Sequence, residues 1–472
     1  MITAQRQIAK YVACDYVMSN IAWLLFNIIR FYMPVITSGY VDLISFLLSR
    51  NVLIGQLFMP LIMMTVYYLS GYYNVAFFKS RLQELFITIG SVAVNTLILY
   101  FTALINDVLP LRVDNYELIL ILFAVQFVCV YPFRLMITAE ATHNIHHRKW
   151  QFNTLVIGCG KQALKLTREL NRRTISLGYH VIGYVDIGEG GCSPLLEKPV
   201  YKNENLEQLC DEQNVKYIIV AVDDNSHTHL NHVLNMFFPL NRPIKMQSDI
   251  FHHLTGRVRL SNIYGQPLVD VSNCAISECG RNMKRLVDII FSSLALILIS
   301  PIIAVLAVLI KCDSRGPVIF SQERIGYHHK PFKLFKLRTM YTDAEGDGMP
   351  RLSSPGDSRI TPLGKWLRKY RLDELPQFWN ILKGDMSLVG PRPEREFFIK
   401  QIMQRAPYYA LMYQIRPGLT SWGMVKYGYA RNVDEMIERL QYDVLYLENM
   451  SMLVDLKIII YTIRTVIMGR GM

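Results

Sequence analysis

Long apolar stretches separated by short polar segments dominate the N-terminal part of the chain. Each stretch is close to the ~20 residues that a helix needs to cross ~30 Å of hydrocarbon. We therefore predict a transmembrane domain of four helices over residues 1–142. Asp15 and Arg30 lie near the ends of the first stretch, where polar groups can reach the membrane interface. The four stretches are Tyr11–Met33, Val52–Tyr73, Leu85–Leu109 and Tyr116–Thr138.

Basic residues gather in alternate connections between these stretches. Lys and Arg concentrate on the cytoplasmic side of membrane proteins, so we expect the N-terminus and the chain after the fourth helix to be cytoplasmic. The start carries no small-residue cleavage site, which argues against a cleavable signal peptide. The cations are Arg6 and Lys10 before the first stretch, Lys79 and Arg81 between the second and third, and Arg148 and Lys149 after the fourth.

Strand and helix patterns alternate over residues 150–270, which predicts a Rossmann-like parallel sheet. The first strand ends in a G-C-G turn at residues 158–160, and Ala163 completes a G-x-G-x-x-A pattern at the start of a helix. Such a turn can hold a pyrophosphate, with Asp186 at the end of the next strand placed for a ribose. A tight turn without a nucleotide explains the same glycines, and we favour that interpretation.

A fifth apolar segment, Leu286–Lys311, is long enough to span a membrane but contains Ser300-Pro301 near its middle. Proline kinks a helix, and a serine hydroxyl can satisfy a freed carbonyl in lipid. We expect this segment to enter the membrane and return to the same face. The last apolar segment carries three charges and is typical of a helix lying in the membrane interface.

Composition agrees with a membrane protein that handles phosphates. The chain has 472 residues, 51% of them hydrophobic, and a net charge of +12; its mean hydropathy is +0.20. We attribute the positive charge to cytoplasmic anchoring and phosphate binding, and expect no nucleic-acid partner. The eight cysteines include no C-x-x-C pair, so we predict neither a zinc site nor a disulfide framework. The histidines at 143, 146 and 147 indicate a polar stretch outside a membrane helix.

The densest chemistry lies around the pair Asp373-Glu374. Thr361-Pro362 should start a helix that continues to about Leu372, and Pro376 and Gly384 should bound the next helix. The acidic pair therefore sits at a junction between helices. Its neighbours in sequence are the cations Lys365, Arg368, Lys369 and Arg371.

This arrangement favours phosphate chemistry. Nearby arginines should keep the carboxylates anionic, and they can also hold a diphosphate. A carboxylate can attack phosphorus, and Mg²⁺ or Mn²⁺ suits carboxylate and phosphate oxygens. A surface salt-bridge network is the alternative explanation of the acidic pair.

Several segments in order, from Lys284 to the C-terminus, resemble the bacterial sugar transferases, the monotopic polyprenyl-phosphate phosphoglycosyl transferases. The whole chain is similar to their long form, in particular to undecaprenyl-phosphate glucose or galactose phosphotransferases. The resemblance implies three parts: a four-helix membrane bundle, a Rossmann-like α/β domain, and a mainly α-helical catalytic domain at 281–472 with a re-entrant helix at 286–311. The segments are KRLVDII, GPVIFSQERIG, PFKLFKLRTM, LRKYRLDELPQFWNILKGDMSLVGPRPE and RPGLTSWG.

The same resemblance implies a role for each matching residue. Asp373 would be the nucleophile that accepts the sugar 1-phosphate, and Glu374 would assist it. Asp385 would join these two at a metal. His329 departs from the family, which commonly has a glycine there. Of the remaining residues, Lys336, Arg338 and Arg368 would hold phosphates, Arg392 would contact the nucleotide, Ser300 and Pro301 would turn the membrane hairpin, and Lys284, Arg285 and Asp288 would anchor it and meet the carrier phosphate.

The reaction expected from the resemblance is transfer of a sugar 1-phosphate from a UDP-sugar, glucose being favoured over galactose, to undecaprenyl phosphate. It would release UMP at the cytoplasmic face of the bacterial inner membrane and start capsule or exopolysaccharide synthesis. Two alternatives stay open: an NAD-dependent nucleotide-sugar dehydratase, which the lack of a Y-x-x-x-K spacing disfavours, and a nucleotide-binding membrane sensor without enzymatic activity. The sequence also leaves open a homodimer.

Overall fold

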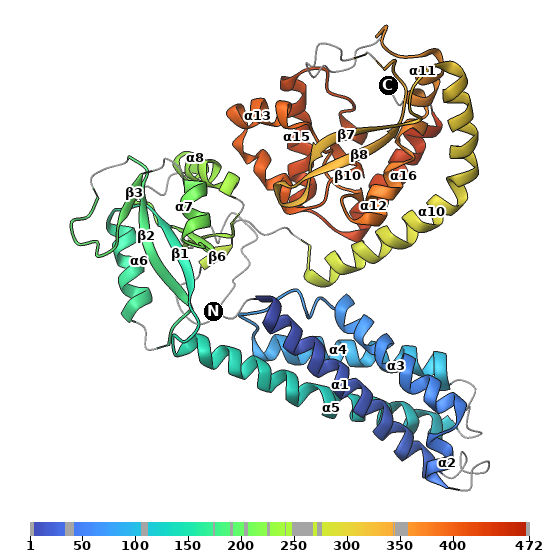
Figure 1. The fold of residues 1–472 in the computed structure, drawn as a ribbon. Helices are drawn as coiled ribbons and strands as arrows, with labels where there is room; N and C mark the ends of the chain where they lie inside the picture. Colours follow the sequence, from blue (N-terminus) through green and yellow to red (C-terminus); the bar gives the residue numbers. More distant parts are fainter. Residues whose placement is uncertain are drawn as a thin grey trace. The chain divides into compact units, whose positions relative to one another are not determined.

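The computed structural model of the chain contains two compact units (Figure 1). The first comprises Met1–Gln151, Thr174–Gly178 and Ser277–Met283, and the second comprises the remaining residues. The structure describes residues 4–33, 42–104, 112–172, 175–188, 192–202, 206–223, 227–240, 242–247, 268–270, 276–342, 344 and 357–468. Part of the predicted domain at 150–270, notably 248–267, therefore lies outside the described residues.

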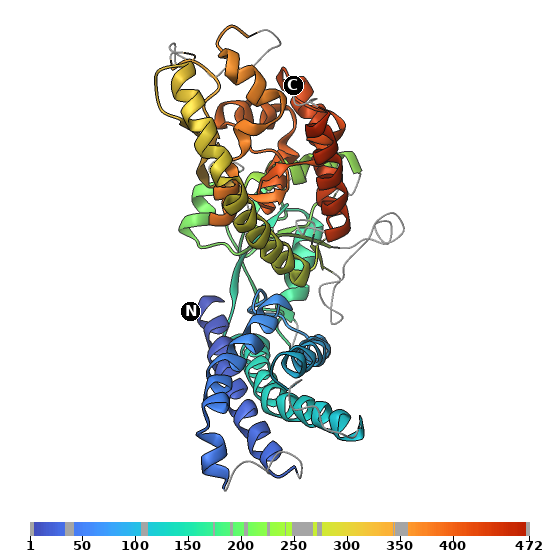
Figure 2. The same ribbon diagram turned by 90° about the vertical axis from the view of Figure 1, so that its right-hand side faces the viewer.

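The first unit is a helical bundle in which the predicted apolar stretches are helical. Helix α1 runs beside α5 in both views (Figures 1 and 2). Among the described residues, five helices are long and apolar enough to cross a membrane. Four of them belong to this bundle, and the fifth is α10 in the C-terminal part. The helices are α1 (Ala4–Phe31), α2 (Leu43–Leu47), α3 (Arg50–Leu69), α4 (Arg81–Leu99), the π-helix η2 (Tyr100–Leu104) and α5 (Arg112–His146).

A buried ion pair holds α1 against α5. Arg134 is fully buried and donates to Asp15 from Nε and Nη2, over 2.9 and 2.7 Å. The hydroxyl of Tyr73 donates to the same carboxylate over 2.7 Å. The expectation that Asp15 reaches the membrane interface is therefore wrong. A carboxylate and a guanidinium in an apolar bundle are stabilised far more by each other than either would be alone.

The second unit begins with a six-stranded sheet of order β3-β2-β1-β4-β5-β6, in which only β6 is antiparallel to its neighbour. This order, with its reversal between β1 and β4, is that of Rossmann-type sheets and confirms the predicted parallel sheet. The elements are β1 (Phe152–Ile157), α6 (Lys161–Arg172), β2 (Tyr179–Asp186), β3 (Val200–Lys202), α7 (Leu206–Glu212), β4 (Tyr217–Val220), α8 (His227–Phe237), η4 (Phe238–Leu240), β5 (Ile244–Gln247) and β6 (Leu268–Asp270).

A disulfide between Cys159 and Cys192 contradicts the prediction of no disulfides. The two residues are 33 positions apart in sequence, and their Cα atoms lie 4.8 Å apart. Strands β1 and β2 are parallel neighbours, so the segments that follow them emerge at one edge of the sheet. The pairing depends on that topology, and no sequence motif indicates it.

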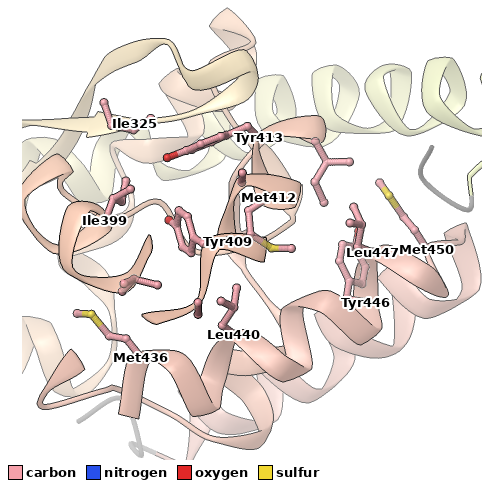
Figure 3. Packing of buried hydrophobic residues seen from close by; sticks show 14 of the residues in the cluster. Ile325, Ile399, Tyr409, Met412, Tyr413, Met436, Leu440, Tyr446, Leu447 and Met450 are labelled. Atoms are coloured by element: carbon pink, nitrogen blue, oxygen red, sulfur yellow. The ribbon is translucent and has the colours of Figure 1, made fainter. Parts of the chain in front are cut away.

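The C-terminal part packs short helices around two small sheets, a β7–β8 hairpin and a parallel β9–β10 pair. Its core is formed by side chains of α13, η7 and α15, among them Ile399, Tyr409, Met412 and Leu440 (Figure 3). The elements are α10 (Glu278–Asp313), β7 (Ile319–Ile325), η5 (Tyr327–His329), β8 (Pro331–Leu337), α11 (Pro362–Lys369), η6 (Leu372–Glu374), α12 (Gln377–Lys383), β9 (Ser387–Val389), α13 (Glu396–Arg405), η7 (Pro407–Gln414), β10 (Gly418–Thr420), α14 (Trp422–Lys426), α15 (Val433–Glu448) and α16 (Met452–Ile467).

Helix α10 continues through Pro301 and curves along its length (Figure 1). Pro301 has no N–H to donate to the carbonyl of Ile297, one turn earlier. The hydroxyl of Ser300 donates to that carbonyl over 2.9 Å, so the serine replaces the missing backbone hydrogen bond. This is the role expected of Ser300 from the sequence.

We predict that Asp15→Ala destabilises the bundle by about 3–5 kcal/mol, because it leaves the Arg134 guanidinium buried without its partner charge. Lys10→Ala is the matched control, since Lys10 pairs with Glu140 across the same two helices at the surface, with both side chains about half exposed. The loss of stability in Lys10→Ala should be ~0–1 kcal/mol, because exposed ion pairs contribute little. Thermal unfolding of the detergent-solubilised variants measures both, and equal losses would contradict the prediction.

Candidate functional site

The acidic pair lies at the junction of two helices, as predicted. Thr361 caps α11 by accepting a hydrogen bond from the Gly364 N–H over 3.0 Å, and Gly384 ends α12 with φ +100°. Helix α11 stops at Lys369, earlier than expected, because Arg371 adopts a left-handed conformation with φ 54°. Such a conformation is disfavoured for arginine and is found mainly where surrounding contacts impose it. It turns the chain so that Asp373 and Glu374, in η6, point into the domain.

Both carboxylates are buried, with exposed fractions of 6% for Asp373 and 4% for Glu374. Two cations from distant segments reach Glu374. Lys336 Nζ, on β8, lies 3.0 Å from Glu374 Oε1 and 3.9 Å from Asp373 Oδ2. Arg392 Nη2 lies 3.4 Å from the same Glu374 oxygen. Burial and these contacts exclude the alternative that the acidic pair belongs to a surface salt-bridge network.

The surroundings shift the pKa values of the two carboxyl groups in opposite directions. Burial opposes ionisation of Glu374, but Lys336 and Arg392 outweigh it and hold the pKa of Glu374 below its usual range. Burial raises the pKa of Asp373, against the lowering effect of Lys336. The expectation that nearby arginines keep both pKa values low is therefore wrong for Asp373, because loss of solvation exceeds the attraction of its neighbours.

Two of the predicted phosphate ligands occupy different environments. Arg368 donates from Nε to the hydroxyl of Thr339 over 2.8 Å, close enough to Asp373 to affect its pKa. Arg338 is buried and donates from Nη2 to the carbonyls of Ser314, over 2.5 Å, and Ile310, over 3.3 Å. Its guanidinium thus caps the C-terminal end of α10. A phosphate contact by Arg338 would require that cap to open.

Asp385, the third predicted metal ligand, pairs with Lys383 over 3.1 Å. Among the described residues, the side chains of Asp373, Glu374 and Asp385 do not lie close enough together to bind one metal ion. The three potential metal ligands that do lie close together are Cys159, Asp186 and Cys192, in the Rossmann-like sheet domain. A metal at the acidic pair would therefore rest on two carboxylates and the substrate.

The residues predicted to anchor the membrane hairpin all contact the domain itself. Lys284 is buried and pairs with Asp455 of α16 over 2.5 Å. Arg285 donates to the carbonyls of Ile381 and Leu382 at the end of α12, over 2.6 and 2.8 Å. The carboxylate of Asp288 accepts a hydrogen bond from the Leu388 N–H over 2.9 Å. Anchoring fits these contacts, whereas a contact of these residues with the carrier phosphate stays a prediction.

Arg392 is held in position by contacts on both sides of its loop. The Gly418 N–H donates to the carbonyl of Pro391 over 2.9 Å. The buried carboxylate of Glu394 accepts hydrogen bonds from Arg439, over 2.6 Å, and from Arg324, over 3.3 Å. These hydrogen bonds fix the loop that carries Arg392, whose guanidinium contacts Glu374. Glu394 supports the loop and makes none of the contacts with Asp373 or Glu374 described above.

Tyr429 is a site residue that sequence reasoning missed. The guanidinium carbons of Arg371 and Arg392 lie 5.2 and 5.0 Å from its ring centroid, within cation–π range. Its side chain is 37% exposed, so it forms the solvent side of the site. In the sequence, Tyr429 is marked only by its position after Gly428. In the structure, Gly428 adopts φ +94°.

His329 adopts φ 60°, which explains why a glycine suits this position. A left-handed conformation costs a residue with a side chain roughly 1–2 kcal/mol, and glycine avoids that cost. The ring of His329 packs against Tyr413 with centroids 4.6 Å apart. The departure from glycine is thus accommodated by a contact with the core residue Tyr413.

A carboxylate of the chain itself occupies the glycine-rich turn between β1 and α6, where a pyrophosphate would bind. Asp223, just after β4, accepts hydrogen bonds from the N–H groups of Gln162 and Lys161 at the start of α6, over 2.8 and 3.0 Å. A Cβ at Gly160 would lie 2.0 Å from that carboxylate, and one at Gly158 would lie 2.4 Å from a backbone carbonyl. The glycines make room for internal contacts, which supports the interpretation of a tight turn.

Comparison with known proteins places these features in a family. A family model described as bacterial sugar transferase matches residues 279–469. The UDP-N-acetylgalactosamine-undecaprenyl-phosphate N-acetylgalactosaminephosphotransferase of Aeromonas hydrophila is 39% identical, over 48% of this chain and 53% of the relative. The UDP-glucose:undecaprenyl-phosphate glucose-1-phosphate transferase of Klebsiella pneumoniae is 34% identical, over 62% of this chain and 63% of the relative. A Caulobacter vibrioides protein of the same name is 40% identical, over 38% and 68%. The chain thus spans less than two thirds of the length of the first two relatives.

We predict that Glu394→Gln destabilises the C-terminal domain by about 3–5 kcal/mol, because it leaves the buried guanidinium of Arg439 and the partly buried guanidinium of Arg324 without their shared charge. Glu396→Gln, two residues later, is the control: Glu396 is exposed and pairs only with Lys400 on its own helix among the ion pairs described. Its unfolding midpoint should stay at the wild-type value. Thermal unfolding of the full-length variants tests this, and a Glu394→Gln protein as stable as Glu396→Gln would refute it.

Proposed function

Because the chain belongs to the bacterial sugar transferase family, we propose that it transfers a sugar 1-phosphate from a UDP-sugar to undecaprenyl phosphate and releases UMP. The observation that carries the proposal is the buried pair Asp373-Glu374, with Glu374 held ionised by Lys336 and Arg392. Relatives with this pair of substrates in their names support the same reaction.

The proposed reaction has two displacements at one phosphorus atom. The carboxylate of Asp373 attacks the sugar-bearing phosphorus of the donor, an aspartyl phosphosugar forms, and the bond to the bridging oxygen breaks to release UMP. A phosphate oxygen of the carrier then attacks the same phosphorus and releases Asp373. One phosphoanhydride is exchanged for another, so no further energy source is needed.

The surrounding cations would bind and neutralise the phosphates. Glu374 keeps Lys336 and Arg392 beside Asp373, where they can meet the negative charge of the diphosphate and of the transition state. Arg368 adds a guanidinium group near Asp373, and Arg371 adds another near Glu374 and Tyr429. Tyr429, whose ring contacts both Arg371 and Arg392, would cover the bound donor.

The donor sugar is proposed as glucose or N-acetylgalactosamine, since both appear in the names of relatives. The product would start a capsule or exopolysaccharide. A panel of UDP-sugars scored for UMP release identifies the sugar. The NAD-dependent dehydratase would instead yield a keto-sugar, and the sensor would release no nucleotide.

We place the domain on the cytoplasmic face of the inner membrane, with α10 as a re-entrant helix. The domain holds both ends of α10: Lys284 and Arg285 contact α16 and α12, and Arg338 caps the end at Ser314. A helix crossing ~30 Å of hydrocarbon would put its ends on opposite sides, where one domain cannot reach both. Helix α16 would lie in the interface, with Leu453, Leu456, Ile460 and Ile463 exposed along one face.

We predict that Asp373→Asn abolishes UMP release, because the amide keeps the shape of the side chain but is no nucleophile. Glu374→Gln should reduce the rate by about 10²-fold or more, since it removes the charge that holds Lys336 and Arg392. The measurement is UMP release by purified enzyme with UDP-glucose or UDP-N-acetylgalactosamine, alongside mass spectrometry of the protein. Wild type should gain a phosphosugar with donor alone; substantial turnover by Asp373→Asn would rule out the covalent route.

We predict an acid limb in kcat/KM at a pH above the usual range of an aspartate, because burial raises the pKa of Asp373 and only its ionised form attacks. Activity is then present above this pKa and falls as the pH drops through it. Lys336→Gln should move the limb to higher pH, since Lys336 lowers that pKa. Lys333→Gln, exposed on the same strand, should leave it in place. An unmoved limb in Lys336→Gln would contradict the assignment.

We predict a requirement for Mg²⁺ or Mn²⁺. The carboxylates of Asp373 and Glu374 are the oxygen donors such ions take, and Asp373 lies 3.9 Å from Lys336, beyond hydrogen-bond reach. A bound ion would reduce the repulsion between these acids and the donor diphosphate. Excess EDTA should stop UMP release and added Mg²⁺ should restore it. Full activity in the chelator would show that the cationic side chains suffice.

A further inference from the structure

The most distinctive feature outside the proposed active site is the sulfur pair at the edge of the Rossmann-like sheet. Cys159 lies between the two glycines of the β1–α6 turn, and Cys192 lies in the segment between β2 and β3. We propose that Cys159 and Cys192 form a reversible thiol–disulfide switch that fastens the β2–β3 segment across the glycine-rich turn. This switch goes beyond the transfer reaction and rests only on the cytoplasmic location proposed above.

The turn holds Cys159 rigidly. Gly158 and Gly160 leave no room for a Cβ, so the backbone on both sides of Cys159 is closely packed. Asp223 accepts hydrogen bonds from the N–H groups of Lys161 and Gln162, just after the turn. The sulfur of Cys159 is thus presented in one direction, and the side chain is buried.

Contacts other than the disulfide hold the segment of Cys192 close to Cys159. The Ser193 N–H donates to the carbonyl of Cys159 over 2.8 Å. Leu196 packs against the small apolar cluster that contains Cys159, Ala163 and other residues. Because these contacts remain after reduction, the two thiols stay close, and the bond can form again without refolding of the domain.

The proposed cytoplasmic location makes the pair a switch. Thiols in the cytoplasm are kept mostly reduced, so a disulfide there forms under oxidising conditions and is later reduced. Cys192 is half-buried and Cys159 almost fully buried, so Cys192 is the first to react.

The oxidant is a small-molecule disulfide such as oxidised glutathione. The Cys192 thiolate attacks one sulfur and releases one thiol; the Cys159 thiolate then attacks the Cys192 sulfur of the mixed disulfide and releases the second. Two electrons pass from the cysteines to the small disulfide, and their two protons end on the released thiols.

Full-length protein equilibrated in mixtures of reduced and oxidised glutathione tests the switch. After acid quenching, free thiols are alkylated in denaturant, the remaining disulfides are reduced, and the new thiols receive a heavy form of the same reagent. Mass spectrometry should find Cys159 and Cys192 converting together, as one linked peptide pair. Cys210, a free cysteine of the same sheet domain, should stay in the thiol form throughout. A pair that stays linked in excess reduced glutathione, or that never links, would overturn the proposal.

Two further measurements distinguish the switch from a general effect of oxidation and from a metal site. Oxidation should slow amide hydrogen exchange in residues 157–163 by about tenfold or more, and Cys192→Ser should abolish that response while Cys210→Ser retains it. Equal slowing in Cys192→Ser would exclude the cross-link as its cause. If the reduced pair resisted alkylation under native conditions until a zinc chelator was added, the cluster with Asp186 would be a metal site, and the switch would be wrong.

Discussion

Glu374 stays ionised inside its domain because Lys336 Nζ and Arg392 Nη2 lie 3.0 and 3.4 Å from one of its oxygens. This contact joins β8, η6 and the loop after β9, three segments that are distant in sequence. Their positions depend on further charged contacts, such as that of Glu394 with Arg324 and Arg439 behind Arg392. A buried charge without a partner would cost several kcal/mol, so each partner needs its own support. The network therefore specifies one arrangement of the site.

The same constraint separates the roles of two adjacent acids. Both are buried, but Lys336 lies closer to Glu374 than to Asp373, and Arg392 also pairs with Glu374. Glu374 consequently serves as the counter-charge that keeps Lys336 and Arg392 beside Asp373. Asp373 keeps a carboxylate whose negative charge is less compensated, and such a carboxylate is a better nucleophile than one held in a tight ion pair. Burial without full pairing suits the role of nucleophile that we propose for Asp373.

Paired charges also organise the apolar parts of the chain. Asp15 and Arg134 join α1 to α5, and Lys284 and Asp455 join α10 to α16. In an apolar environment these contacts are directional, whereas the packing of aliphatic side chains alone permits several registers. At Pro301 the missing donor is replaced by the hydroxyl of Ser300, so α10 bends without leaving a carbonyl unpaired. Polar groups within the apolar helices thus determine how those helices are arranged.

The sequence by itself determined the elements and the chemistry that depend on local order. Apolar length located the helices, prolines and a glycine located the start of α11 and the two ends of α12, and ordered motifs located Asp373 and Glu374. Tertiary structure decided everything that depends on which distant segments meet. It placed Arg338 at the end of α10 and Asp385 beside Lys383, and it brought Tyr429 and Glu394 to the site. It also joined Cys159 to Cys192 and buried Asp15 against Arg134. Residue type and spacing describe what a side chain can do, but its partners and its solvation, which set its charge and its role, exist only after the chain has folded.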